Sequence, residues 1–167
     1  MEIKIDDIKK LIENKGFKLQ KIGKIKRSKN DFVEDVVALF MKDNYAIEIR
    51  TYTLELVIRF KNIKIDHDYI DIYSMMYYFE LMEGFIAKKN FFERFFSQQV
   101  ARSSIVELNY FFLKKKLDDI LTMLNDENFK STVNILNNPK NELTEKEFSK
   151  MYFLSKTNFN KLLDKYL

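Results

Sequence analysis

The chain has 167 residues, the size of a single domain, with a formal net charge of +4. It contains no cysteine and one histidine, which excludes disulfides, a cysteine nucleophile, zinc sites of the Cys/His kind and a two-histidine metal site within one chain. Its three glycines, Gly16, Gly23 and Gly84, are too scattered to form a phosphate-binding loop.

The first predicted element is a helix near the N-terminus that stops at Lys15-Gly16. Asp6 and Asp7 suit the positive end of a helix. Apolar residues then recur at helical spacing, at Ile5, Ile8, Leu11 and Ile12. These local signals predict an amphipathic helix at the N-terminus.

Four predicted strands follow. An irregular strand spans residues 17–25, and the next three span residues 32–41, 45–51 and 54–61. In the third strand Tyr45, Ile47 and Ile49 alternate with Ala46, Glu48 and Arg50, so the two sets should face opposite sides of the sheet. The connections are too short for parallel crossovers, and we therefore expect an antiparallel meander.

The second half of the sequence changes to helical periodicity. Asp66 and Asp68 are predicted to cap a helix that ends near Gly84, and a long helical stretch from Asn90 to Leu124 should break at Ser103-Ser104. A break at residues 125–128, a short helix at 129–136 and one or two terminal helices complete the chain. The sequence thus predicts an α+β fold with helices packed on the sheet. We expect one α+β unit over residues 1–137 and a helical extension over 138–167 within the same domain.

The charges are segregated along the chain. Residues 1–30 carry ten basic and four acidic groups, whereas residues 31–84 carry five basic and eleven acidic groups. The densest basic patch is Lys15, Lys18, Lys21, Lys24, Lys26, Arg27 and Lys29. Such a patch suits phosphates or an acidic partner, or it is a solvated face of a lysine-rich protein.

The acidic residues of the following segment form a predicted acidic belt. We expect this belt to bind a basic protein through Asp35, Asp43, Glu48, Glu55, Asp66, Asp68 and Asp71. Asp66, His67, Asp68 and Asp71 also have the chemistry of a cation site, but aspartates collect at helix N-termini for electrostatic reasons alone. We favour the helix-terminus interpretation and predict no metal site.

Asp35 together with Glu48-Ile49-Arg50 resembles the acid-then-Glu-x-Lys pattern of metal-dependent nucleases of the restriction-endonuclease-like fold. The resemblance implies that two carboxylates hold Mg²⁺ and that a basic residue positions water, although Arg50 stands where lysine is usual. The favoured alternative is ion pairing of Glu48, Arg50, Glu55 and Arg59 across one face of the meander.

Residues 148–163 resemble a helix-turn-helix motif. Phe159 and Leu162 would anchor the second helix, and Ser155, Lys156, Asn158, Asn160 and Lys161 would face the major groove of DNA. Phe153 stands where the turn usually carries glycine. The same apolar spacing is expected of two helices that simply pack together.

Aromatic residues provide a further binding signal. The chain has 16 Phe and 9 Tyr, and clusters such as Phe91, Phe92, Phe95 and Phe96 cover more than one helical face. Adjacent aromatic side chains cannot all face the core, so part of this set favours a partner or homodimer surface.

The leading functional hypothesis is therefore a non-catalytic protein-binding module without a cofactor, similar in size and composition to immunity proteins that neutralise toxins. The alternative is a nucleic-acid-binding regulator that uses the basic patch and the C-terminal helices, and a metal-dependent nuclease is the minor alternative. The charged N-terminus has no apolar run for a signal peptide, and the longest uncharged run of the aromatic-rich centre, residues 72–79, is too short to span a bilayer. We expect a cytoplasmic protein.

Overall fold

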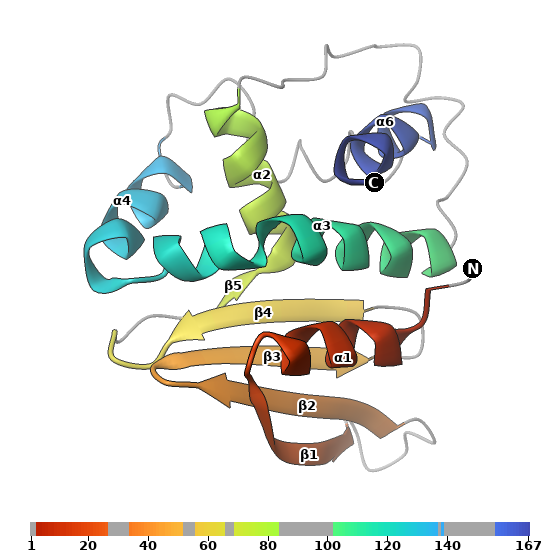
Figure 1. Ribbon diagram of the computed structural model, residues 1–167, viewed down its shortest axis with the longest axis vertical. Coiled ribbons are helices and arrows are strands. Elements are labelled where there is room, and N and C mark those ends of the chain that lie inside the picture. The colour runs from red at the N-terminus through yellow and green to blue at the C-terminus, as the bar shows by residue number, and fades with distance from the viewer. Residues whose placement is uncertain are drawn as a thin grey trace.

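The computed structural model describes residues 3–26, 34–51, 56–65, 69–83, 102–136, 138 and 156–167. The fold is α+β, as the sequence predicted, with an N-terminal helix, a five-stranded sheet and further helices in the C-terminal half (Figure 1). The elements, in order, are α1 (Ile5–Asn14), β1 (Lys18–Lys26), β2 (Glu34–Lys42), β3 (Tyr45–Thr51), β4 (Leu56–Asn62), β5 (Ile70–Asp71), α2 (Ile72–Met82), α3 (Arg102–Met123), α4 (Asp126–Leu136) and α6 (Lys156–Tyr166).

The strands form an antiparallel meander in the order β1-β2-β3-β4-β5. The predicted turn between β2 and β3 is present, and Asp43 adopts φ = 50° there, a conformation that aspartate tolerates better than most residues. The register of β1 against β2 shifts between Leu19 and Lys21, which confirms that the first strand is irregular.

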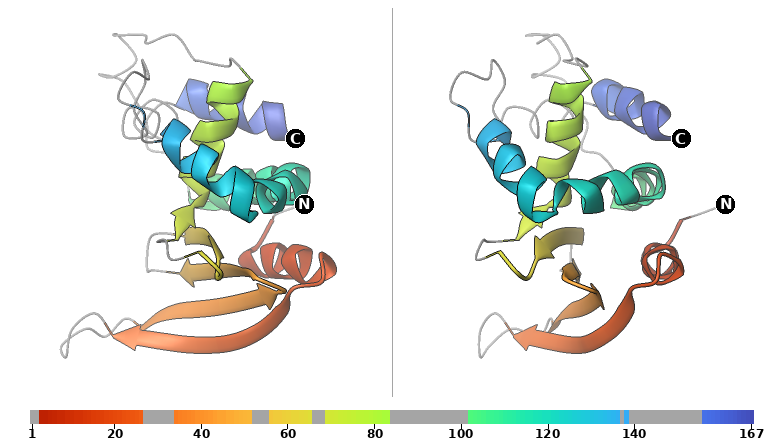
Figure 2. Two further views of the ribbon diagram at one scale, coloured as in Figure 1. Left: turned by 90° about the vertical axis from the view of Figure 1, so that its left-hand side faces the viewer. Right: turned by 60° about the vertical axis from the view of Figure 1, so that its left-hand side comes forward.

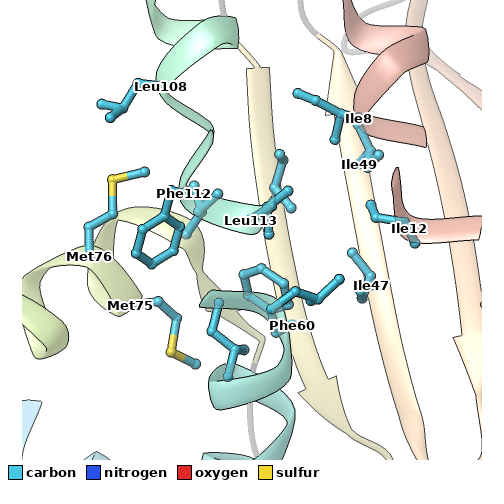
Figure 3. Packing of buried hydrophobic residues seen from close by; sticks show 14 of the residues in the cluster. Ile8, Ile12, Ile47, Ile49, Phe60, Met75, Met76, Leu108, Phe112 and Leu113 are labelled. Carbon is cyan, nitrogen blue, oxygen red and sulfur yellow. The ribbon is translucent and has the colours of Figure 1, made fainter. Parts of the chain in front are cut away.

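One face of the sheet forms the core. Ile47, Ile49 and Phe60 of this inner face are at most 1% exposed, and Figure 3 shows them beside Ile8 and Ile12 of α1. Met75 and Met76 of α2 and Phe112 and Leu113 of α3 complete the same cluster. The helices that the structure describes thus lie to one side of the sheet (Figures 1 and 2).

The junction between the sheet and α2 differs from the sequence prediction. Ile70 and Asp71 pair with Phe60 and Arg59 as a fifth strand, and α2 begins only at Ile72. Asp71 caps this helix, because its Oδ1 accepts hydrogen bonds of 2.8 Å from the backbone N–H groups of Tyr73 and Ser74. The caps predicted at residues 66 and 68 lie outside the described residues.

Two helix boundaries also differ. α3 begins at Arg102 and runs through Ser103 and Ser104, where the sequence favoured a break. α4 begins at Asp126, inside the predicted break at residues 125–128. Asn125 caps this helix, since its Oδ1 accepts a hydrogen bond of 2.9 Å from the N–H of Asn128. An asparagine cap looks like a turn in the sequence because the same side chain favours both.

The C-terminal helix belongs to the same core. Phe159, Leu162 and Tyr166 of α6 are at most 2% exposed, and the ring of Tyr166 meets that of Phe112 edge-on with 5.0 Å between centroids. Of the predicted boundary between the α+β unit and the helical extension, at residues 137 and 138, the structure describes Asn138 alone.

Candidate binding surface

The side of the sheet opposite the core carries both charged and apolar residues, and we call it the outer face. Side chains alternate along each strand, and the register aligns Lys21, Leu39, Glu48 and Arg59 in one row across four strands. The flanking rows complete the outer face with Lys18, Met41, Ala46 and Lys61 on one side and with Val37, Arg50 and Val57 on the other. Charged and apolar residues are thus interspersed on it, and most of its charged residues are cations.

Glu48 is the acidic residue at the middle of the outer face, and it is only 8% exposed. Its Oε1 accepts hydrogen bonds from Nε of Arg50 at 2.6 Å and from Nε of Arg59 at 2.9 Å, and its Oε2 accepts one from Nη2 of Arg50 at 3.1 Å. Burial acts to raise the pKa of Glu48, but the hydrogen bonds and charges of the two arginines outweigh it and lower the pKa below its usual value. The carboxylate is therefore held in its ionised form, and the two arginines balance its negative charge.

Tyr69 extends this cluster. The guanidinium of Arg59 lies 5.1 Å and the ammonium of Lys61 5.7 Å from the centre of its ring, a distance at which cations are attracted to an aromatic face. Burial, together with the negative charge of Glu48, raises the pKa of Tyr69. Glu48, Arg50 and Arg59 thus form ion pairs across one face of the meander, as predicted in place of a nuclease-like site.

The nuclease-like pattern is not assembled by the register. Asp35 lies on β2 four residues from Leu39, the residue opposite Glu48, and at about 3.3 Å per residue this spacing is about 13 Å along the strand. A shared ion at about 2.1 Å from each carboxylate oxygen needs a much shorter separation. The carboxylate of Glu48 is also occupied by two arginines.

The structure describes only part of the predicted acidic belt. Asp43 is exposed at the β2–β3 turn, Glu48 is buried and Asp71 caps α2. Glu55, Asp66, His67 and Asp68 lie outside the described residues. Asp35 lies on β2, so the structure describes four of the belt residues; Glu48 and Asp71 are engaged within the chain, and the belt as a docking surface stays a prediction.

The structure brings two residues of the basic patch onto one face with cations from outside the predicted patch. Lys18 and Lys21 are exposed on β1, in the same rows as Lys61 and Arg59. Lys15 is bound to Asp118 of α3 at 2.6 Å. Lys24 and Lys26 continue along β1, whereas Arg27 and Lys29 lie outside the described residues. The strict alternation of β3 and β4 was the signal that Arg50, Arg59 and Lys61 share one face.

Of the helix-turn-helix-like segment, α6 is described and Ser155 is not. Phe159 and Leu162 are buried as predicted. Asn160 and Lys161 are exposed, and Lys156 and Asn158 lie in the first turn of the helix. Its DNA-binding role stays a prediction.

A second buried carboxylate links α6 to α2 through hydrogen bonds. Glu80 is 3% exposed, and its Oε1 accepts hydrogen bonds from Nζ of Lys165 at 2.5 Å and from the hydroxyl of Tyr166 at 2.9 Å. Burial raises the pKa of Glu80 despite the opposing charge of Lys165. Glu83 binds Lys165 at 2.8 Å and Lys116 at 2.9 Å. This cluster joins three helices and has a structural role.

A polar cavity of about 310 Å³ lies where the β3–β4 end of the sheet meets the α3–α4 turn. It is lined by Asn44, Tyr45, Asn62, Lys64, Asn125 and Glu127. The side chain of Asn62 stabilises the fold, since it donates a hydrogen bond of 2.7 Å to the carbonyl of Leu124 and accepts one of 3.1 Å from the N–H of Lys64. Within the described ranges no three His, Cys, Asp or Glu side chains gather into a group able to hold a metal ion.

Comparison of the chain with protein-family models, with curated proteins and with solved structures yields no match. None of the helices in the described part of the chain combines the length and apolar character that crossing a bilayer requires. The candidate site therefore stands on its own geometry, and it is the outer face of the sheet.

Proposed function

We propose that this protein is a non-catalytic protein-binding module of the inhibitor or immunity type, and that it engages its partner through the outer face. One observation carries the proposal. With Glu48 neutralised by Arg50 and Arg59, the outer face presents partly exposed apolar side chains together with a surplus of positive charge, on a sheet that is already folded.

The energetics of association favour such a surface. Leu39, Met41 and Val57 are partly exposed, and covering them removes apolar area from water. Lys18 and Lys21 are exposed and steer an oppositely charged partner during encounter. A preformed sheet also loses little conformational entropy on binding. The complementary partner carries an acidic surface with apolar side chains, unlike the basic partner expected for the acidic belt.

The size of the face sets how the partner must bind. Four strands about 4.8 Å apart and about seven residues long cover roughly 450 Å² at about 3.3 Å per residue. A stable protein interface buries about 800 Å² on each partner. The partner must therefore reach beyond the outer face, over its edge or onto neighbouring segments.

The test compares three forms of the full chain as baits in an extract of the native host. These are the wild type, a K18E/K21E variant of the outer face, and a matched control, K114E/K130E, on the exposed sides of α3 and α4. We expect a protein that the wild type and the control retain and that K18E/K21E loses. After purification, its association rate with K18E/K21E should be at least tenfold lower. Identical retention by all three forms would refute the proposal.

Nucleic acid is the second candidate, because Arg59 and Lys61 flank Tyr69 on a face that also carries Lys18 and Lys21. Cations with an aromatic side chain are typical of single-strand binding surfaces. Nuclease treatment of the extract separates the two candidates, since it abolishes retention only if nucleic acid is the ligand. A nucleic-acid complex should also weaken steeply between about 50 and 200 mM salt.

A further inference from the structure

β1 is the edge strand of the described sheet, and no segment in the described part of the chain pairs with its second side. It pairs with β2 alone, and Figure 2 (left) shows it as the outermost strand of the molecule. No backbone hydrogen bond joins its other side to any segment within the described ranges. A row of unpaired N–H and C=O groups is a template for one more strand. At nine residues, β1 is long enough to specify such pairing.

The side chains of β1 favour a partner strand with apolar residues on one side. Leu19 and Ile22 are 41% and 64% exposed, high values for large apolar side chains. They lie opposite Phe40 and Ala38, which belong to the inner side of the sheet. Lys18 and Lys21 lie on the outer face. Along residues 18–22 an added strand would therefore meet apolar groups on one side and cations on the other, whereas Lys24 and Lys26 occupy inner-side positions opposite Val36 and Glu34.

The charge of β1 selects against a second copy of this chain. Its sequence carries Lys18, Lys21, Lys24 and Lys26 and no acidic residue. Pairing two β1 strands edge to edge would bring lysines close to lysines, which destabilises the pair. A strand with acidic residues would instead form opposite-charge pairs at the same positions. The edge thus accepts acidic strands and rejects its own copy.

We propose that β1 binds an extended acidic segment of the partner protein as a sixth strand of the sheet. This inference rests on the proposed function and names the partner's element. Strand addition supplies backbone hydrogen bonds for affinity and alternating side chains for specificity. It also widens the outer face, which by itself is too small for a stable interface.

The probe is a nine-residue peptide that alternates glutamate and valine, titrated against the full-length protein. Two comparators test the two parts of the inference. One has the same sequence with N-methyl groups on alternate residues, which removes donors from the pairing edge, and the other replaces glutamate by lysine. We expect the glutamate peptide to bind at least tenfold more tightly than either comparator. Hydrogen exchange of the β1 amides should slow when it binds.

Variants of the protein provide the second arm. K18E/K21E should weaken binding of the glutamate peptide at least tenfold, whereas K114E/K130E should leave it unchanged. Equal binding of the N-methylated peptide, or exchange protection outside β1 alone, would overturn strand addition. If the peptide fails but the native partner still depends on Lys18 and Lys21, the edge inference is wrong and the proposed function stands. If neither depends on these lysines, both fail.

Discussion

Replacing Glu48 by glutamine tests whether this residue holds the sheet together or serves a partner. The substitution keeps the volume of the side chain and removes one negative charge from the centre of the outer face. Arg50 and Arg59 then lose the charged acceptor of the hydrogen bonds that the structure shows between 2.5 and 3.1 Å. We expect the folded state to lose stability for this reason.

The magnitude follows from burial. Breaking a fully buried ion pair costs about 3–5 kcal/mol, but the side chains of Arg50 and Arg59 remain 28% and 26% exposed and stay partly hydrated. The amide oxygen of glutamine also still accepts a hydrogen bond. We therefore expect a loss of about 2 kcal/mol, which lowers the melting temperature by about 4–8 °C for a chain of this size.

The loss should depend on pH in a defined direction. The folded state lowers the pKa of Glu48, so the unfolded chain takes up this proton first as the pH falls. The stability due to Glu48 is therefore present above the usual value of 4.5 and disappears as the pH drops through the folded pKa. The difference between wild type and E48Q should shrink over that range.

The assay is urea unfolding followed by far-UV circular dichroism, because the chain has no tryptophan. The matched control is D43N, the same change at an exposed turn residue, and it should alter stability by less than about 0.5 kcal/mol. A loss below 0.5 kcal/mol for E48Q at pH 7, or a loss that persists undiminished at low pH, contradicts the structural role of Glu48.

Three further substitutions probe other buried or capping groups by the same assay. D71A removes the acceptor of two backbone N–H groups of α2 and should cost about 1 kcal/mol; an unchanged midpoint would exclude a capping role. N109L replaces a fully buried amide for which neither polar atom has a partner among the described residues, and it should raise stability by about 1 kcal/mol, whereas a loss would show that the amide is satisfied. Glu80 has a raised pKa, so the stability difference between wild type and E80Q should fall as the pH rises from about 4.5 through the folded pKa. A difference that rises with pH, as for Glu48, would refute the dominance of burial at Glu80.

Local sequence signals were enough to predict the N-terminal helix and the first four strands. Ile8 and Ile12 are fully buried as their spacing predicted, and Ile47 and Ile49 face the core as the alternation of β3 required. These features depend on neighbours within a few residues, where side-chain period and turn chemistry act directly. The α+β class followed from the change of period after the fourth strand.

Features that depend on residues far apart in the sequence could not be predicted from the sequence alone. β5 consists of two residues, Ile70 and Asp71, and it forms only because β4 offers Phe60 and Arg59 as partners. Asp71 was assigned to an acidic belt, yet it caps a helix that begins one residue later. Such short elements carry no periodic signal of their own.

The candidate site shows the same division. The sequence placed Glu48 and Arg50 on one side of a strand, but only the tertiary structure shows that Arg59 completes the neutralisation of Glu48. Likewise, the lysines at 18 and 21 join Lys61 on one face because the register aligns residues more than forty positions apart. Composition and period decide which residues can be buried, whereas the sign of a surface depends on which charges the register brings together, because a paired charge exerts little field on a partner.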